Sequence, residues 1–426
     1  MLFLGRVGAE CGFNVAFDDF VRIFVGSLLL AICPLSASAL AESPWVVVRP
    51  GNPAYKFVGI EIVHFRDAHT GWAAGEDGWS GQTLLLRTTD GGLTWQEELT
   101  DFPYERAFFI SPLEGWTFRD RPFRGWALRA PLMEEIELYH TTDGGLSWQL
   151  QKGKIVNLVY ISKIEPEEPF EYRVLTKVYF LDSQRGWLLG FVNSDKGVRG
   201  KNIAEWVAGN LFLFTNDGGR TWSGQIDVYP TGPVWHDPGG ISFGAPKDID
   251  FVNHKDGWIL AATRWIYRTS DGGRTWKRLE TGYPPGFIMK DIDFVDTQHG
   301  WIVGNNVVLF TQDGGRTWTN RSPDHDRCTY ELLYFTSAGE GWVAGYKSAP
   351  HQWKYWILHT ADGGKTWKIE WEHNDWISYL GYDLATGVLW VGGRPGILLK
   401  RAVKVVVVTP REKLSTSWGK IKIRAP

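Results

Sequence analysis

The octapeptide Thr311-Gln312-Asp313-Gly314-Gly315-Arg316-Thr317-Trp318 is one of six copies of the pattern T-x-D-G-G-x-[T/S]-W in this chain of 426 residues. The copy follows an apolar run, 307–310, so its Asp-Gly-Gly lies where a strand reverses. Glycine supplies the positive φ angles of a tight turn, and the Asp carboxylate accepts hydrogen bonds from backbone N–H groups of that turn. The pattern therefore predicts a β-hairpin that returns a tryptophan to the core. The other copies begin at Thr88, Thr141, Thr215, Thr269 and Thr360.

The spacing of the copies is typical of propeller blades. Successive Asp residues are separated by 42 residues (271 to 313) to 74 residues (143 to 217), and a blade of four strands needs about 40 to 50. A Gly-Trp pair precedes every copy: Gly71-Trp72, Gly115-Trp116, Gly186-Trp187, Gly257-Trp258, Gly300-Trp301 and Gly341-Trp342. Because such a unit cannot bury its apolar face alone, neighbouring units must stack. We therefore predict an all-β fold, a β-propeller with insertions between strands.

Three further strand-like runs follow the last octapeptide, at 378–382, 389–392 and 397–399. They match the first three strands of a blade without the Asp turn. We therefore predict a seven-bladed β-propeller with six octapeptide blades and a degenerate seventh blade. Its fourth strand is either 403–408 or 45–48, and the sequence leaves both open.

The octapeptide is similar to the Asp box of bacterial neuraminidase repeats (BNR). Together with the Gly-Trp pair, it makes each blade resemble the propeller of photosystem II assembly and stability factors, over roughly residues 45 to 400. The resemblance implies a non-catalytic scaffold that binds a protein client, such as a membrane-protein subunit during assembly. It also implies a structural role for the six Asp-box Asp residues, because Asp boxes lie at turns on the blade periphery in these families.

An enzyme is the minority hypothesis. Sialidases resemble this chain in their Asp boxes but begin their propeller with an R-I-P motif, whereas the only Arg-Ile here is Arg22-Ile23. A polysaccharide-cleaving propeller needs two carboxylates that face each other across a cleft. The alternative to a protein-binding scaffold is a carbohydrate-binding or glycan-cleaving propeller, in which Trp79, Trp235 or Trp353 would stack on sugars.

The first 41 residues resemble a secretory signal peptide. Arg22 precedes an apolar stretch, which small residues follow up to Ala41. We expect cleavage after Ala39 or Ala41, a natural start near Val21, a single propeller domain over 42–426, and a periplasmic or secreted protein.

Composition excludes several classes of site. A net charge of −3 does not indicate a nucleic-acid binder. Only Cys328 follows the signal segment, so no internal disulfide is expected. Histidine spacing and glycine-rich segments match no metal or phosphate motif. We expect no metal and no cofactor.

A basic loop is the first candidate binding element. Arg119, Arg121, Arg124 and Arg129 surround Trp126, and guanidinium groups suit the recognition of carboxylates in a protein client. The alternative is a solvated charged loop that pairs with the acidic run of Glu165, Glu167, Glu168 and Glu171. The long loops predicted on one face of the propeller are expected to form the recognition surface, with Trp235 and Trp353 on it.

The central channel is the second candidate. Alternate residues of each innermost strand should point inward, and the polar ones are His64, Arg106, Lys177, Asp248, Asp250, Asp291 and Asp293. These side chains are either merely solvated or functional. In the functional case, neighbouring carboxylates such as Asp250 and Asp293 would raise each other's pKa.

Overall fold

The computed structural model describes residues 45–77, 80–119, 130–131, 135–160, 172–194, 207–230, 246–261, 265–280, 282, 288–324, 328–349, 352–383 and 385–402. Their regular secondary structure is almost exclusively strand, with two short 3-10 helices, η1 (Pro53–Tyr55) and η2 (Tyr104–Arg106). The predicted all-β propeller is confirmed.

Five sheets of four strands follow the predicted blade pattern. The first contains β2 (Ile62–Phe65), β3 (Gly71–Glu76), β4 (Thr83–Thr88) and β5 (Gln96–Thr100). The next contains β15 (Pro246–Phe251), β16 (Gly257–Ala261), β17 (Trp265–Thr269) and β18 (Lys277–Glu280). Another contains β19 (Met289–Phe294), β20 (Gly300–Gly304), β21 (Val307–Thr311) and β22 (Thr319–Asn320). A further sheet contains β23 (Cys328–Phe335), β24 (Gly341–Ala349), β25 (Gln352–Thr360) and β26 (Lys368–His373).

The fifth four-stranded sheet joins the two ends of the described chain. It contains β27 (Ile377–Asp383), β28 (Val388–Gly393), β29 (Ile397–Ala402) and β1 (Val46–Arg49). β1 pairs antiparallel with β29, with Val46 opposite Lys400. Of the two predicted closing strands, the structure thus uses the one at 45–48, while 403–408 lies outside the described residues.

Two meanders are fused in one sheet of nine strands. One meander is β6 (Phe108–Phe109), β7 (Gly115–Arg119), β9 (Ile136–Thr141) and β10 (Gln149–Tyr160); the other is β11 (Tyr172–Phe180), β12 (Gly186–Ser194), β13 (Val207–Thr215) and β14 (Thr221–Pro230). β8 (Ala130–Pro131) pairs with β11. The first half of β10 pairs antiparallel with β9, and its second half continues parallel to β14. The predicted number of seven blades stays a prediction, because these two meanders share one sheet.

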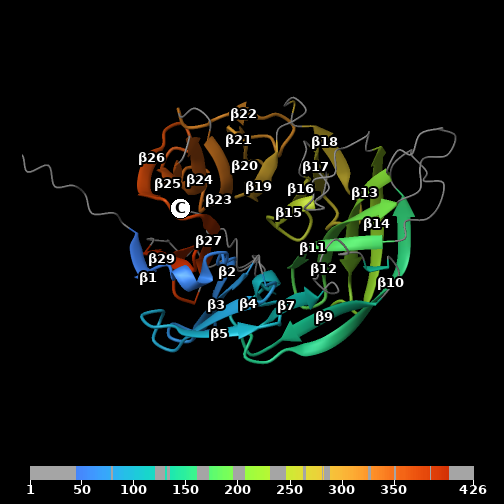
Figure 1. Cartoon of the computed structure of the whole chain (residues 1–426). Helices are drawn as coiled ribbons and strands as arrows, with labels where there is room; N and C mark the ends of the chain where they lie inside the picture. Colours follow the sequence, from blue (N-terminus) through green and yellow to red (C-terminus); the bar gives the residue numbers. More distant parts are fainter. Residues whose placement is uncertain are drawn as a thin grey trace, which may run out of the picture. The chain divides into compact units, whose positions relative to one another are not determined.

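The innermost strand of each sheet contacts the innermost strands of its neighbours. β27 contacts both β2 and β23; β19 contacts β23 and β15; β11 contacts β15 and β6. Between β6 and β2, the side chain of His64 stacks on Phe109 with 3.6 Å between ring centroids. The innermost strands therefore follow one another around a central channel (Figure 1).

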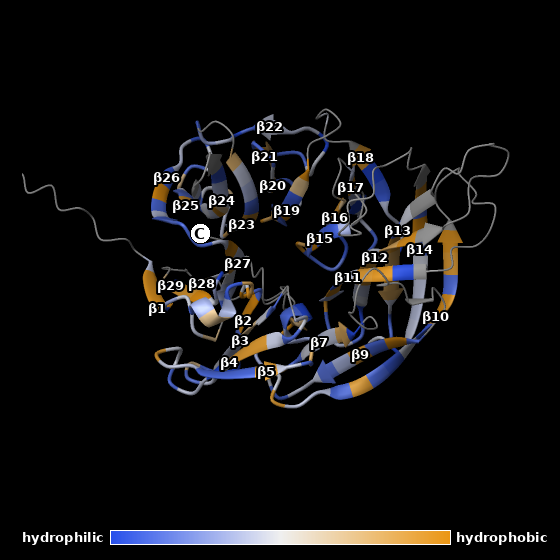
Figure 2. Cartoon of the chain, in the orientation of Figure 1, coloured by the Kyte–Doolittle hydropathy of each residue, from blue (hydrophilic) through white to orange (hydrophobic). Residues whose placement is uncertain are grey.

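Burial changes from the inner to the outer strands. All five residues of β20 are buried, whereas β5 is almost entirely exposed and largely hydrophilic in Figure 2. Between sheets, tryptophans of the Gly-Trp pairs stack on phenylalanines of the next innermost strand, as Trp301 does on Phe335 at 3.7 Å between centroids. Aromatic packing of this kind buries a large apolar area without disulfides.

Each Asp box closes its hairpin through hydrogen bonds to the Asp carboxylate. In the fifth copy, Thr311 Oγ1 and Thr317 N donate to Asp313 Oδ1, and Thr317 Oγ1 donates to Oδ2. Gly314 and Gly315 have φ angles of 74° and 87°, which only glycine adopts without strain. Although burial opposes the effect, these hydrogen bonds lower the pKa of Asp313 to about 2. The Asp boxes are thus structural turns.

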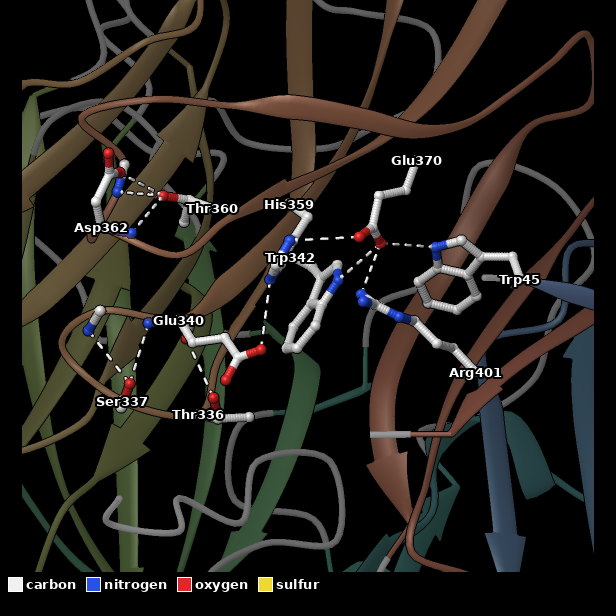
Figure 3. Close-up of polar contacts among 12 residues, drawn as sticks. Trp45, Thr336, Ser337, Glu340, Trp342, His359, Thr360, Asp362, Glu370 and Arg401 are labelled. Carbon is white, nitrogen blue, oxygen red and sulfur yellow. Dashed lines mark hydrogen bonds and ion pairs between the residues drawn. The ribbon is translucent and has the colours of Figure 1, made fainter. Parts of the chain in front are cut away.

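Glu370 of β26 contacts both ends of the described chain, and its side chain is only 6% exposed. Its Oε2 accepts hydrogen bonds from Trp45 Nε1 (3.3 Å), Trp342 Nε1 (3.2 Å) and Arg401 Nη1 (2.6 Å). His359 Nδ1 lies 3.3 Å from Oε1. Figure 3 shows these side chains converging on the carboxylate. One carboxylate therefore joins β26 to the first residue described and to β29, near the last.

Candidate functional site

A pocket of about 730 Å³ lies at the end of the channel where the innermost strands begin. Every innermost strand, or the residues directly before it, contributes lining side chains. The pocket has the size of known small-ligand and peptide side-chain sites.

Regular β-bulges position the lining side chains. In β15 the pairing steps from Pro246 to Asp248 and leaves out Lys247; in β19 it leaves out Lys290. The same shift occurs in β11, β23 and β27, at Thr176, Glu331 and Ser378. A bulge leaves one residue unpaired and redirects its side chain. Each of these strands therefore presents two consecutive residues to the pocket instead of alternate ones.

Glu61 and Glu105 occupy the corresponding places before β2 and β6. Each stands four residues before a phenylalanine, Phe65 or Phe109, as Lys290 stands before Phe294. Both line the pocket. Strict alternation along the innermost strands does not select these two positions, although their constant distance to the phenylalanine, which stands six residues before Gly-Trp, is a usable signal in the sequence.

One side of the pocket is acidic. Glu61, Glu76 and Glu105 lie together there, with Arg106 3.4 Å from Glu105 and 3.9 Å from Glu76. The Glu61 side chain is exposed to solvent inside the pocket, and the pocket walls surround it. This enclosure, followed by the charges of Glu105 and Glu76, raises the pKa of Glu61 to about 7. Glu61 can therefore hold or release a proton near neutral pH.

The opposite side of the pocket carries three lysines, Lys177, Lys247 and Lys290, among the carboxylates of Asp248, Asp291 and Glu331. Lys247 and Lys290 come from the neighbouring strands β15 and β19, and Lys290 Nζ lies 3.5 Å from Glu331 Oε1. Lys177 forms an ion pair with Asp248. Burial and the charge of Lys290 lower the pKa of Lys247. Among the described residues, no carboxylate lies within ion-pair distance of Lys247, so this cation is available to an anionic group.

The predicted channel residues divide into two levels. Arg106, Lys177, Asp248 and Asp291 line the pocket beside the bulged positions. Asp250 and Asp293 are buried further along the strands. Asp250 Oδ2 accepts the Phe294 N–H at 2.7 Å, and Asp293 Oδ2 accepts the Phe335 N–H at 2.7 Å. These two carboxylates thus link one innermost strand to the next.

His64 has a packing role in the structure. The ring is buried, and its Nε2 lies 3.1 Å from the Pro112 carbonyl oxygen. Burial lowers the pKa of His64 to about 3, so the ring is neutral. Its stacking on Phe109 helps to join β2 to β6.

The predicted loop residues are only partly described. Arg119 lies at the end of β7, where its Nη2 donates to the Asp101 carbonyl at 3.0 Å and its guanidinium lies 5.8 Å from the Tyr139 ring centroid. Trp353 lies on β25 and is 51% exposed. Arg121, Arg124, Trp126, Arg129 and Trp235 lie outside the described residues, as does Trp79.

The described residues contain neither a metal-binding cluster nor a membrane-spanning helix. They contain no group of three or more His, Cys, Asp or Glu side chains arranged to hold a metal ion. Within the same residues, no helix has the length and hydropathy required to cross a membrane.

Comparison with known families and structures identifies similar proteins. The family model described as "Photosynthesis system II assembly factor YCF48" matches residues 279–375. The structure of YCF48 bound to D1 peptide is similar at 17% identity and a TM-score of 0.52, covering 86% of this chain and 97% of that chain. YCF48 from Cyanidioschyzon merolae is 17% identical with a TM-score of 0.49, covering 85% and 99%. A GH74 xyloglucanase from Xanthomonas campestris is 12% identical with a TM-score of 0.47, covering 89% and 56%. Comparison with curated protein sequences finds no significant match.

The first of these structural likenesses establishes the fold, and the family model covers the sheets around β19 to β26. Both agree with the repeated Asp boxes and Gly-Trp pairs. The chain is thus a BNR-type Asp-box β-propeller that resembles the photosystem II assembly factor family.

Proposed function

We propose that this chain is a non-catalytic scaffold that binds a segment of a protein client at the channel pocket, in the manner of an assembly factor. The observation that carries the proposal is the pocket itself, where the bulged innermost strands present fixed charges of both signs. A similar propeller, YCF48, has been solved with a D1 peptide bound. By this analogy, the client is a membrane-protein subunit.

A ring of paired strands suits a binding function, because its charged groups keep their positions without a conformational change. The charged residues of the pocket lie at bulges of paired strands or next to such strands, so the charged groups are held in place before a client arrives. Preorganised groups lose little entropy on binding. A flexible client segment would supply the adaptability.

The test is recovery of a client from the native host. The mature chain would be tagged, purified in mild detergent and analysed by mass spectrometry, in parallel with the variant Glu61→Lys/Lys247→Glu. A matched control is Lys365→Glu, which alters an exposed lysine in an Asp-box loop. Stoichiometric recovery of one protein by the wild type and the control, and not by the pocket variant, supports the proposal. Recovery of the chain alone contradicts it.

A carbohydrate-cleaving function is the second candidate, and Glu61 is the observation that favours it. A carboxyl group with a pKa of about 7 can act as a general acid at neutral pH. The test is release of reducing ends from a panel of plant and bacterial polysaccharides by the wild type and by Glu61→Gln. Turnover that Glu61→Gln abolishes would replace the scaffold proposal with an enzyme.

We also propose that residues 1–41 direct export and are removed, so that the propeller works in the periplasm or outside the cell. The signal-like order of Arg22, the apolar stretch and Ala41 supports this. N-terminal sequencing of the protein from its host tests it. A mature N-terminus near Leu40 or Glu42 is expected, and an intact N-terminal segment in the cytoplasm would contradict it.

A further inference from the structure

Four aromatic side chains lie together beside the pocket, in a cluster that we call the aromatic ledge: the exposed Trp353 and Trp376, the half-buried Tyr346 and the buried Tyr355. The Tyr346 ring lies 5.1 Å from Trp353, 5.4 Å from Tyr355 and 6.5 Å from Trp376, measured between centroids. Tyr346 and Tyr355 are direct cross-strand partners on β24 and β25. The ledge therefore has a rigid backbone support.

The aromatic ledge is continuous with the pocket. Trp376 lines the pocket, and the guanidinium of Arg394 lies 4.7 Å from its ring centroid. Burial and the nearby charge of Glu331 raise the pKa of Tyr355 to about 12, so the phenol at this border keeps its proton. Glu331 also belongs to the pocket, where it pairs with Lys290. A ligand can thus touch the ledge and the charged pocket at once.

Exposure separates the two tryptophans of the ledge from the aromatic core of the repeats. Trp353 is 51% exposed and Trp376 is 37% exposed, whereas the Gly-Trp tryptophans are fully buried. Exposed, preorganised tryptophan and tyrosine rings are the commonest energetic centres of protein interfaces. Trp376 also packs on Tyr355 and Arg394, but part of its ring and of the Trp353 ring stays open to a ligand.

The charges of the pocket indicate the kind of ligand. Lys247 and Lys290 lie on one side, and Glu61 and Glu76 lie on the other. A neutral glycan has no charge to offer either side, whereas a peptide carries both signs. A volume of about 730 Å³ admits a few side chains of an extended chain and excludes a folded domain.

We infer that the aromatic ledge and the pocket together form one docking groove for an extended client segment of mixed charge. In this groove an aromatic or aliphatic client side chain lies on Trp353 and Trp376. An acidic client side chain faces Lys247, and a basic one faces Glu61. The inference rests on the proposed function and specifies the chemistry of the client.

Selection from a phage-displayed library of short random linear peptides tests the inference. The wild type is expected to enrich peptides that contain an aromatic or large aliphatic residue together with an acidic and a basic residue. Trp353→Ser and Trp376→Ser should each remove the aromatic preference and weaken binding of a selected peptide roughly 30-fold, the effect of losing an interface hot spot. Lys247→Glu should remove the acidic preference, and Glu61→Lys the basic one. Leu93→Ser, at an Asp-box residue that is 69% exposed, is the matched control and should leave the selection unchanged.

The possible outcomes separate the inference from the function on which it rests. Peptides whose composition is the same for the wild type and all groove variants would overturn the groove while leaving a protein client in place. No enrichment by the wild type, combined with no recovered client, would overturn both. Binding on a glycan array that Trp353→Ser abolishes would also overturn the inference, because the ledge would then be a sugar platform. A misfolded variant would lose all peptide binding. If Lys247→Glu or Glu61→Lys still binds peptides but loses its preference for one charge, misfolding is excluded, and this change of specificity is the decisive result.

Discussion

Replacing Glu370 with alanine is expected to lower the free energy of unfolding by about 3–5 kcal/mol, the usual effect of removing one partner of a buried ion pair. Glu370 is 6% exposed and its ion-pair partner Arg401 is 16% exposed, so little water can replace the lost carboxylate. The substitution would also leave the indole N–H groups of Trp45 and Trp342 without the acceptor they use (Figure 3). Each buried donor left without a partner costs about 1–3 kcal/mol. The terms overlap, so we expect the total to stay near the range for the ion pair.

The assay is urea unfolding followed by far-UV circular dichroism, together with hydrogen exchange of the backbone amides. Loss of Glu370 should accelerate exchange in β1 and β29, which the carboxylate joins to β26, more than in β19 to β22. Glu370→Gln keeps an acceptor for one indole and should lie between the wild type and Glu370→Ala. The matched control is Glu98→Ala, because the Glu98 side chain is 58% exposed and its pair with Arg87 contributes at most about 1 kcal/mol.

A double-mutant cycle separates the ion pair from general damage. If the two charges stabilise the protein through each other, Glu370→Ala/Arg401→Ala should be at least about 1 kcal/mol more stable than the sum of the single effects predicts. The reasoning is refuted if Glu370→Ala unfolds within about 0.5 kcal/mol of the wild type, or if the two effects simply add.

Three further predictions concern the turns, the fused sheet and the pocket. Asp313→Asn should lower the free energy of unfolding by about 1 kcal/mol at pH 7 and should make it fall less in acid, as urea unfolding at pH 7 and 3 would measure. The pKa of Asp313 is about 2 in the folded protein and 3.8 in the unfolded chain, so its carboxylate stabilises the fold fully above pH 4 and no longer does so once the pH falls through 2. Gly153→Ala would place a Cβ 2.5 Å from Trp222 Nε1 and should lower stability by about 1–3 kcal/mol, whereas an unchanged melting temperature would argue against the parallel pairing of β10 with β14. Glu61→Gln should raise the melting temperature at pH 8 and not at pH 4. The pKa of Glu61 is about 7 in the folded protein and 4.5 in the unfolded chain, so ionisation of Glu61 opposes folding only as the pH rises through this interval. An equal effect at both pH values would contradict the raised pKa of Glu61.

The fold was predictable because its determinants are local. Asp313, Gly314 and Gly315 specify a turn through hydrogen bonds within a few residues, and the chain repeats this turn at blade spacing. The choice of closing strand was not local. Residues 45–48 and 403–408 are both apolar enough to form the fourth strand, and the pairing of β1 with β29 in the structure shows that the fold uses the first of them.

The site was predictable only in part because strict alternation does not hold at a bulge. Counting every second residue selects Asp248 and Asp250, and it passes over Lys247, which the shifted pairing turns into the pocket. The same count selects Asp250 as a channel acid, whereas its carboxylate accepts the backbone N–H of Phe294. The parallel continuation of β10 was equally invisible, since nothing in 154–160 distinguishes an outer strand of one blade from an added strand of the next.

The pairing of β1 with β29 sets an order of events during synthesis. β1 is the first described strand to leave the ribosome, and its partner is the last. Until β29 emerges, Val46 and Val47 form a short apolar edge with no native partner, the kind of segment on which chaperones act and at which chains associate wrongly. The nascent protein can therefore complete its sheets one after another, but it cannot become a ring until β29 has been synthesised. A truncation just before residue 397 should accordingly yield a chain with most of its blades formed and with its first strand exposed to other proteins.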